Sequence, residues 1–398
     1  MKVVAAVWFF QTANYLDRVA MSFAGPSIMK SLSMEPNQFG IVLSAFGVGY
    51  FLAQIPGGLL ADRWGAKPLM VIAPLFWALF GGATGFVATL AGFVLTRACL
   101  GVSEGMSNAS CYKVIGDNFE SRDRARAVGI WATAFAVAPA LAGPIVGTLL
   151  VHYGWQAVFF FMMAPALIAA FVNSRFIPAT PLIDAIDRTA PDKSGSFVRI
   201  LRTPSLWVLS LAYFGFNIAY WGYIGWMPSY LALERHIDVK SIGVLGGIPY
   251  VFAFFGMLLA GWLGSTALYR YRPQLVAVFY VCGAVSLYFA YGAETLPSTL
   301  TGLSFAAFFL YGGFGPFGAI ILECAPEGHR AAYAGVISTV GQVAGAVAPA
   351  IVGALVETTG TFASGFSFMI AGLCVASACL MFVTFFRFGT ATPVVAAI

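Results

Sequence analysis

Residues 129–154, GIWATAFAVAPALAGPIVGTLLVHYG, return further along the chain as GVISTVGQVAGAVAPAIVGALVETTG at residues 335–360. At this shift of 206 positions, three glycines and one preceding arginine coincide: Gly129 with Gly335, Gly147 with Gly353, Gly154 with Gly360 and Arg124 with Arg330. Both stretches are apolar and long enough for a membrane-spanning helix. The repetition predicts a chain of two related halves, as in many membrane proteins built from internal repeats.

The composition is that of a membrane protein. The chain is 60% hydrophobic and 9% charged, with a mean hydropathy of +0.85, whereas soluble domains are about 45 to 50% apolar and about 25% charged. A helix needs about 20 apolar residues to cross the bilayer core, and twelve such stretches start near residues 3, 38, 67, 90, 124, 155, 205, 241, 273, 298, 330 and 364. We predict an all-α membrane protein of twelve helices, with six-helix bundles at 1–178 and 205–398 related by pseudo-two-fold symmetry, and a polar cytoplasmic linker at 179–204.

The positive charges predict how the chain lies in the membrane, because cytoplasmic loops carry an excess of Lys and Arg. With the N-terminus inside, the outer segments hold only Lys30, Arg235 and Lys240. Both termini are therefore expected in the cytoplasm, and this topology explains the net charge of +5 better than a nucleic-acid partner does. The first span shows no cleavage pattern and is expected to be retained. Its short lead favours a multi-pass protein of a bacterial inner membrane.

Four ionisable residues interrupt the apolar stretches of the first half: Asp17 and Arg18 in the first span, and Arg97 and Glu104 in the fourth. A charge at mid-bilayer depth costs at least about 2.5 to 3.5 kcal/mol, so such residues usually face a bundle interior or a water-filled path and mark function. They make this chain a transporter candidate. The alternative is a permanent ion-pair network that only fixes helix packing.

Helix geometry predicts different surroundings for these charges. Positions three and four apart share a face, which gives the first span a polar stripe of Gln11, Asn14, Tyr15, Arg18 and Ser22. We expect this stripe to line a cavity, whereas Asp17 points about 100° away, toward a helix interface. Arg97 and Glu104 lie about 10 Å apart along their helix, so each needs a partner elsewhere. An anion at Arg18 would compete with the other partners of that arginine and change proton binding at Asp17 or Glu104.

Other polar and aromatic side chains are candidates for the same cavity. Tyr50 of the second span either lines it or serves packing, and Asn217 and Tyr220 share a face of the seventh span. The predicted substrate-binding residues are Tyr15, Arg18, Tyr50, Arg97, Asn217, Tyr220, Ser338 and Gln342.

The loop after the second span, GGLLADRWGAK at residues 57–67, resembles the GxLaDrxGrkxxl loop of the major facilitator superfamily. Its glycines allow close helix approach, and its acid can meet a helix N-terminus or a basic residue at a cytoplasmic gate. The predicted gating residues are Gly58, Asp62, Arg63, Gly65 and Lys67. The matching loop of the second half, from Gly261 to Arg272, lacks the acid, so we expect one gate to be stronger than the other.

Three further runs resemble the anion:cation symporter family: NYLDR at 14–18, QIPGG at 54–58 and RACLGVSEG at 97–105. The resemblance implies a twelve-helix fold, monomeric function and proton-driven transport of an organic anion by alternating access. It matches Asp17 and Glu104 to the proton-coupling acids of the family and Arg18 to its anion-contacting arginine.

The chain departs from the sugar-acid members of that family in polar residues. Where many of them carry GIFNSGS, this chain has GIWATAF at 129–135, in which Ala132 and Phe135 replace polar residues that could hydrogen-bond a ligand. In the tenth span, a tryptophan found in many members is replaced by Gly318. Each unsatisfied hydroxyl of a buried ligand costs about 1 to 3 kcal/mol. We therefore expect an aromatic or short-chain acid with one or two carboxylates, with sugar acids as the alternative.

Two other functions fit parts of the sequence: proton-driven efflux of lipophilic drugs, favoured by the 16% aromatic content, and a non-transporting membrane sensor. Arg18 argues against cationic cargo, because like charges repel. An enzyme is not expected, since His152, His236 and His329 are assigned to loops and no GxxxxGK[ST] phosphate loop occurs. We expect no metal and no cofactor. The expected partners are a small organic anion, protons and the lipid bilayer.

Overall fold

The computed structural model describes residues 2–119, 121–179, 201–325 and 330–387, and the elements of these segments are helices. In chain order they are α1 (Lys2–Leu32), α2 (Pro36–Trp64), α3 (Ala66–Thr84), α4 (Leu90–Asn118), α5 (Ser121–Ala132), α6 (Ala134–Phe176), α9 (Pro204–Leu233), α10 (Val239–Leu245), α11 (Ile248–Ser265), the short 3₁₀ helix η1 (Tyr269–Tyr271), α12 (Arg272–Gly292), α13 (Leu296–Gly312), α14 (Phe314–Cys324), α15 (Arg330–Thr359) and α16 (Ala363–Arg387). Most of the predicted linker at 179–204 lies outside the described residues, as does His329.

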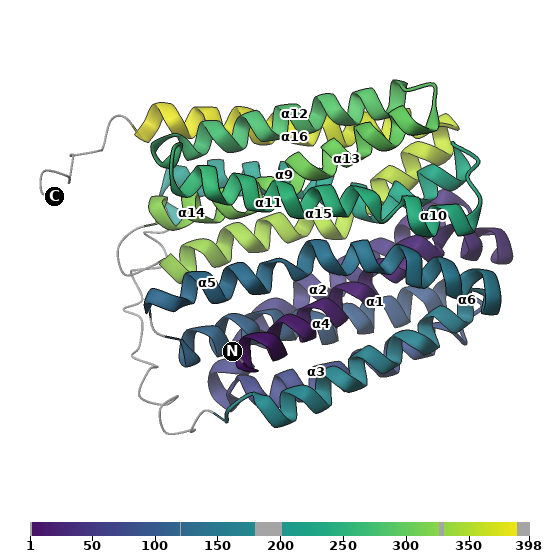
Figure 1. Ribbon diagram of the computed structural model, residues 1–398, viewed down its shortest axis with the longest axis horizontal. Helices are drawn as coiled ribbons and strands as arrows, with labels where there is room; N and C mark the ends of the chain where they lie inside the picture. The colour runs from purple at the N-terminus through teal and green to yellow at the C-terminus, as the bar shows by residue number, and fades with distance from the viewer. Residues whose placement is uncertain (1, 120, 180–200, 326–329, 388–398) are drawn as a thin grey trace, which may run out of the picture.

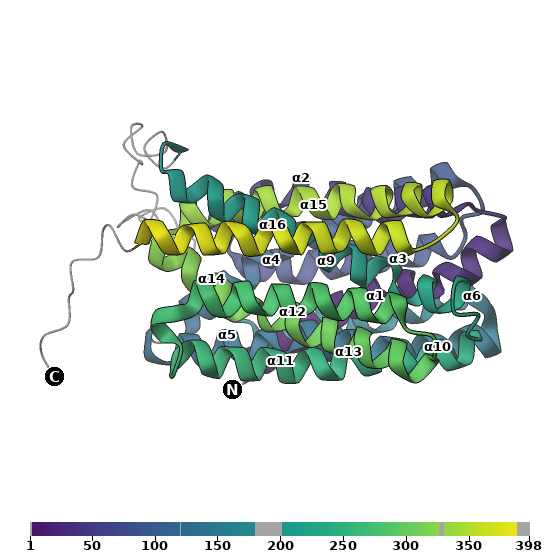
Figure 2. The same ribbon diagram turned by 90° about the horizontal axis from the view of Figure 1, so that it is seen from above.

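The helices run side by side along the long axis of the molecule (Figures 1 and 2), and in Figure 1 helices α9 to α16 lie above helices α1 to α6. In the N-terminal bundle, α1 to α6, helix α2 packs on α4, α1 packs on α6, and α3 packs on both α4 and α6. In the C-terminal bundle, α9 to α16, helix α9 packs on α15 and α16, and α13 packs on α11 and α12. The all-helical architecture predicted from the sequence is confirmed.

Eight helical stretches of the described residues are long and apolar enough to cross a membrane, fewer than the twelve predicted spans. One of the eight, Ala127–Phe176, contains two predicted spans, because the chain turns at Gly154, where φ is 80° and ψ is 174°. Helices α1, α4 and α9 are not among the eight. Their hydropathy is lowered by the buried charges of α1 and α4 and by the tyrosines, tryptophans and Asn217 of α9.

Hydrogen bonds join the two bundles at the end of the molecule where α1 ends and α2 begins, named here the α10 end (Figure 1). The Asn37 amide N–H donates to Oε2 of Glu357 at 3.0 Å, and the Ala350 amide N–H donates to Oγ of Ser44 at 3.0 Å. A third such bond lies deeper, at the site described below. The opposite end of the molecule, where α5 begins and α14 finishes, is named the α5 end.

Glycines bring α2 and α4 into backbone contact. A Cβ added at Gly101 would lie 2.2 Å from the Phe46 carbonyl oxygen, and one added at Gly105 would lie 2.4 Å from the Tyr50 carbonyl oxygen. Small residues of this kind let membrane helices approach closely. The contact places Phe46 and Tyr50 of α2 beside the polar face of α4.

This contact predicts a destabilising effect for Gly101→Ala. The new methyl group meets backbone atoms rather than a side chain that can move, so α2 and α4 must separate, at a cost of about 1 to 3 kcal/mol. Thermal unfolding in detergent measures the loss. The matched control is Gly116→Ala on the same helix, where an added Cβ has nothing within 4 Å. Equal melting temperatures for the two variants would contradict the prediction.

Candidate functional site

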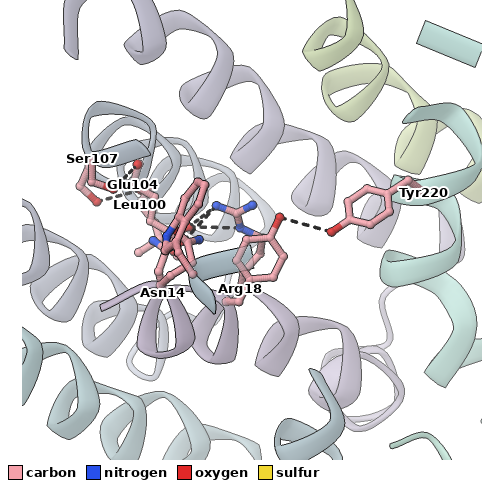
Figure 3. A network of polar contacts seen from close by, with 10 residues as sticks. Asn14, Arg18, Leu100, Glu104, Ser107 and Tyr220 are labelled. Carbon is pink, nitrogen blue, oxygen red and sulfur yellow. Dashed lines mark hydrogen bonds and ion pairs between the residues drawn. The ribbon is translucent and has the colours of Figure 1, made fainter. Parts of the chain in front are cut away.

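Arg18 of α1 and Glu104 of α4 form a buried ion pair (Figure 3). Nη2 of Arg18 lies 2.8 Å and Nε lies 3.2 Å from Oε2 of Glu104. Nη2 also donates to Oδ1 of Asn14, one turn earlier on α1, at 3.2 Å. The two charged side chains are 4% and 0% exposed. The partner that Glu104 was expected to need outside its own helix is therefore the arginine of α1.

Aromatic rings surround the guanidinium of Arg18. Its Cζ atom lies 4.4 Å from the ring centre of Tyr15, 4.7 Å from that of Tyr50 and 4.9 Å from that of Phe46, all in the N-terminal bundle. The ring of Trp221, from α9 of the C-terminal bundle, lies 5.5 Å away. Ring faces attract cations, by about 0.5 to 2 kcal/mol depending on desolvation. The guanidinium of Arg18 therefore lies between the two bundles, and aromatic rings take the place of water around it.

Asp17 and Arg97 are buried close to this pair, and among the described residues neither side chain makes a hydrogen bond or an ion pair, although Arg97 lies 5.0 Å from the ring centre of Phe46. Asp17 faces α3, where a Cβ on Gly81 would lie 3.2 Å from its Oδ1, and its Oδ2 has no hydrogen-bond partner. Nε of Arg97 and Oε1 of Glu104 also have none. Within the described residues, no ion pair within 4 Å joins Arg97 to either acid. Buried polar atoms are normally paired, so these three atoms are available to a ligand or water, and the two carboxylate oxygens also to a proton.

The remaining predicted substrate residues are only partly brought together. The hydroxyls of Tyr15 and Tyr220 lie 3.3 Å apart across the bundle interface. Asn217 is turned back on its own helix, donating from Nδ2 to the Tyr213 carbonyl at 2.7 Å. Two α15 residues are partly exposed, and their side chains make no hydrogen bond among the described residues: Ser338 and Gln342. The contacts therefore centre on α1, α2, α4 and α9.

Two aromatic contacts of the site were absent from the sequence prediction. Phe46 lies one helical turn before Tyr50, and Trp221 follows Tyr220, so both are neighbours of predicted residues. The chain has 37 Phe and 9 Trp, however, and such abundance hides the few rings that contact Arg18. Only the arrangement of helices singles them out.

The predicted gating loop joins α2 to α3. Gly58 and Asp62 lie near the end of α2, although the Asp62 side chain is outside the described atoms, and Gly65 makes the turn with a φ of 84°. Arg63 is exposed and Lys67 is half-buried. The gating role of these residues stays a prediction.

The second-half loop lacks an acid of its own, and the structure supplies one from another helix. Arg272 at the start of α12 forms an ion pair with Glu323 of α14 and donates from Nε to the Gly264 carbonyl at 2.7 Å. The pair ties η1 and the start of α12 to the end of α14 at the α5 end. The loop is therefore charge-paired despite the missing acid.

The comparisons with known proteins agree with this architecture. The chain belongs to the Major Facilitator Superfamily, whose family model matches residues 7–349. It is 28% identical over 404 residues to a hexuronate transporter of Bacillus subtilis, covering 97% of this chain and 94% of the relative. It is 27% identical over 376 residues to a probable L-galactonate transporter of Escherichia coli, covering 89% and 83%.

The fold also matches solved structures. A D-xylose-proton symporter superposes with a TM-score of 0.77 and 14% sequence identity, covering 96% of each chain. Identity this low supports the fold alone. Family and fold together confirm a multi-pass membrane transporter rather than an enzyme.

Proposed function

We propose that this protein carries an organic anion together with protons by alternating access, as a monomer in a bacterial inner membrane. The observation that supports the proposal most is the buried pair of Arg18 and Glu104, flanked by rings from both bundles. The relatives named as hexuronate and L-galactonate transporters support a carboxylate as cargo. A cargo carboxylate has the chemistry of the Glu104 side chain and can replace it on Arg18.

Exchange of partners couples the two cargoes. When an anion takes Arg18, Glu104 loses its cation in surroundings that contain little water. An isolated ionised carboxylate is very costly there, so Glu104 becomes neutral by binding a proton. Asp17, the second predicted coupling acid, lies behind Arg18 against α3 and is the other group able to hold a proton. One anion and one proton therefore bind together, and the net charge of the site does not change.

Alternating access requires the bundle contacts to change. The Lys and Arg distribution supports a cytoplasmic position for the α5 end. In the proposed cycle, the hydrogen bonds at the α10 end then close the path from outside. In the other state these bonds break and the gating loops at the α5 end meet. The Tyr15–Tyr220 contact lies between the two ends and is remade in each cycle.

Uptake into proteoliposomes tests the proposal. With an interior one pH unit more alkaline, we expect labelled glucuronate to accumulate about tenfold above the level in protein-free liposomes under the same gradient, since one pH unit corresponds to about 1.4 kcal/mol per coupled proton. A protonophore should abolish accumulation. Uptake that ignores the gradient would contradict coupling. Competition by lipophilic cations instead of anions would favour efflux of drugs, and binding without counterflow would favour a sensor.

A further inference from the structure

Four aromatic side chains close a ring across the bundle interface beside Arg18. In the N-terminal bundle the rings of Tyr15 and Phe135 lie 4.8 Å apart at 72°, and in the C-terminal bundle those of Tyr220 and Phe314 lie 5.3 Å apart at 82°. Between the bundles, the tyrosine hydroxyls are 3.3 Å apart, and the Phe135 and Phe314 rings are 6.3 Å apart and nearly parallel, at 8°. We name these four residues the aromatic quartet.

The quartet is placed by interruptions in two helices. Phe135 follows the break between α5 and α6, and Phe314 follows the break between α13 and α14. Glycines make room at the second break, where a Cβ added at Gly313 would lie 2.4 Å from the ring of Tyr280. Each bundle thus contributes one edge-on tyrosine and one flat phenylalanine, and Tyr15 also contacts the guanidinium of Arg18.

The surroundings of the quartet offer few partners for ligand hydroxyls. The Tyr15 and Tyr220 hydroxyls already face each other. Oε1 of Gln11 accepts from the Trp131 indole at 3.2 Å, and Nδ2 of Asn217 is used by its own helix. A polyhydroxylated acid would have to share the few donors that remain unpaired, among them Asn14 Nδ2, Trp221 Nε1 and the Tyr311 hydroxyl. Each ligand hydroxyl left over costs about 1 to 3 kcal/mol.

The charges near the quartet suit a single carboxylate. The buried charged side chains of the described residues are Asp17, Arg18, Arg97 and Glu104, all in the N-terminal bundle. Two cations and two acids sum to zero, so one extra negative charge is balanced by one proton. A second carboxylate reaching toward the C-terminal bundle would meet no buried cation among the residues described there.

Tyr311 offers a neutral donor on the C-terminal side, as do Trp221 Nε1 and the Tyr280 hydroxyl. Tyr311 packs against Tyr220, with ring centres 5.3 Å apart, and against Phe314 at 6.1 Å. Its hydroxyl is buried and has no hydrogen-bond partner. Buried hydroxyls normally have a hydrogen-bond partner, so an unpaired one indicates room for a partner from a ligand. A polar substituent on the ligand would provide it.

We propose that the aromatic quartet forms the apolar half of the substrate site and that the carried anion is a compact aromatic monocarboxylate. Its carboxylate binds Arg18, its flat ring lies against Phe135 and Phe314, and a ring hydroxyl bonds to Tyr311. The proposal rests on the proposed function, in which Arg18 holds the anion. It adds the class of anion and names Phe135, Phe314 and Tyr311 as specificity-determining residues.

Calorimetry on the full chain in nanodiscs tests the proposal with four probes: 4-hydroxybenzoate, benzoate, cyclohexanecarboxylate and glucuronate. We expect 4-hydroxybenzoate to bind about tenfold more tightly than cyclohexanecarboxylate, because ring pairing adds to simple burial. Glucuronate should bind more weakly still. Tyr311→Phe should reduce the advantage of 4-hydroxybenzoate over benzoate about fivefold, whereas Tyr288→Phe, on the exposed side of α12 at 73% exposure, should change nothing.

The outcomes distinguish failure of the proposed specificity from failure of the proposed organic-anion transport. Tighter binding of glucuronate than of 4-hydroxybenzoate would overturn the proposed specificity and leave organic-anion transport standing. Equal binding of benzoate and cyclohexanecarboxylate by the wild-type protein would do the same, and this comparison needs no variant to fold. Absence of binding by all four acids, together with no proton-driven uptake, would overturn the proposed function and this inference with it.

Discussion

The Glu104→Gln protein is expected to bind organic anions more tightly than the wild-type protein and to lose proton-driven accumulation. Glutamine removes the negative charge that competes with cargo for Arg18, whose Nη2 lies 2.8 Å from the carboxylate. It also removes the group that takes up a proton when the anion arrives. We expect anion affinity to rise about tenfold and gradient-driven uptake to fall about 100-fold, the range seen when one partner of a buried charge pair is removed.

Stability gives a second readout of the same variant. Arg18 is left buried without its anion, which costs about 3 to 5 kcal/mol. A bound cargo carboxylate restores the pair, so adding benzoate or glucuronate should raise the melting temperature of Glu104→Gln more than that of the wild-type protein. Exchange of labelled for unlabelled anion should persist, because exchange needs no net proton movement.

Glu294→Gln is the matched control for this experiment. Glu294 lies exposed in the connection between α12 and α13, so its neutralisation should change neither affinity nor accumulation. If Glu104→Gln accumulates anion in response to a pH gradient as the wild-type protein does, the coupling role of Glu104 is wrong.

The class of protein was predictable because its physical signals are local. Apolar stretches of membrane length and a polar break between the halves need only the order of residues. The four buried charges were also visible, because a charge inside such a stretch is costly enough to need a reason. Helix periodicity separated Arg18 from Asp17, and in the structure Asp17 faces α3 while Arg18 faces Glu104.

The partners of these charges were not predictable from periodicity. Arg18 and Glu104 are 86 positions apart, and Arg272 and Glu323 are 51 apart, so their contacts depend on how whole helices pack. The aromatic quartet depends on helix interruptions before Phe135 and Phe314, which no single residue marks clearly. Membrane helices carry many apolar residues on every face, so hydropathy does not reveal which ring faces the cargo.

Arg18→Gln is expected to weaken anion binding about 100-fold, and the double variant Arg18→Gln, Glu104→Gln is expected to recover stability without recovering function. In the single variant Glu104 is buried without a cation and anion affinity falls about 100-fold, because the lost hydrogen bonds were made by a charged group. Replacing both members by neutral amides removes the uncompensated charge, and buried pairs replaced together often cost nothing in stability.

The double-mutant cycle distinguishes a functional pair from a purely structural one. Melting temperatures and anion binding are measured for the wild-type protein, both single variants and the double variant, and the coupling energy is taken from the four values. We expect the effects of the two substitutions on stability to be strongly non-additive, so that the double variant melts close to the wild-type protein. Anion binding stays weak in every variant that lacks Arg18. Arg18→Lys sharpens the test, since it keeps the charge but loses the planar fork and the ring contacts that Tyr15 and Tyr50 provide. If the double variant still binds and accumulates organic anions, the pair serves packing alone and the cargo must be held elsewhere.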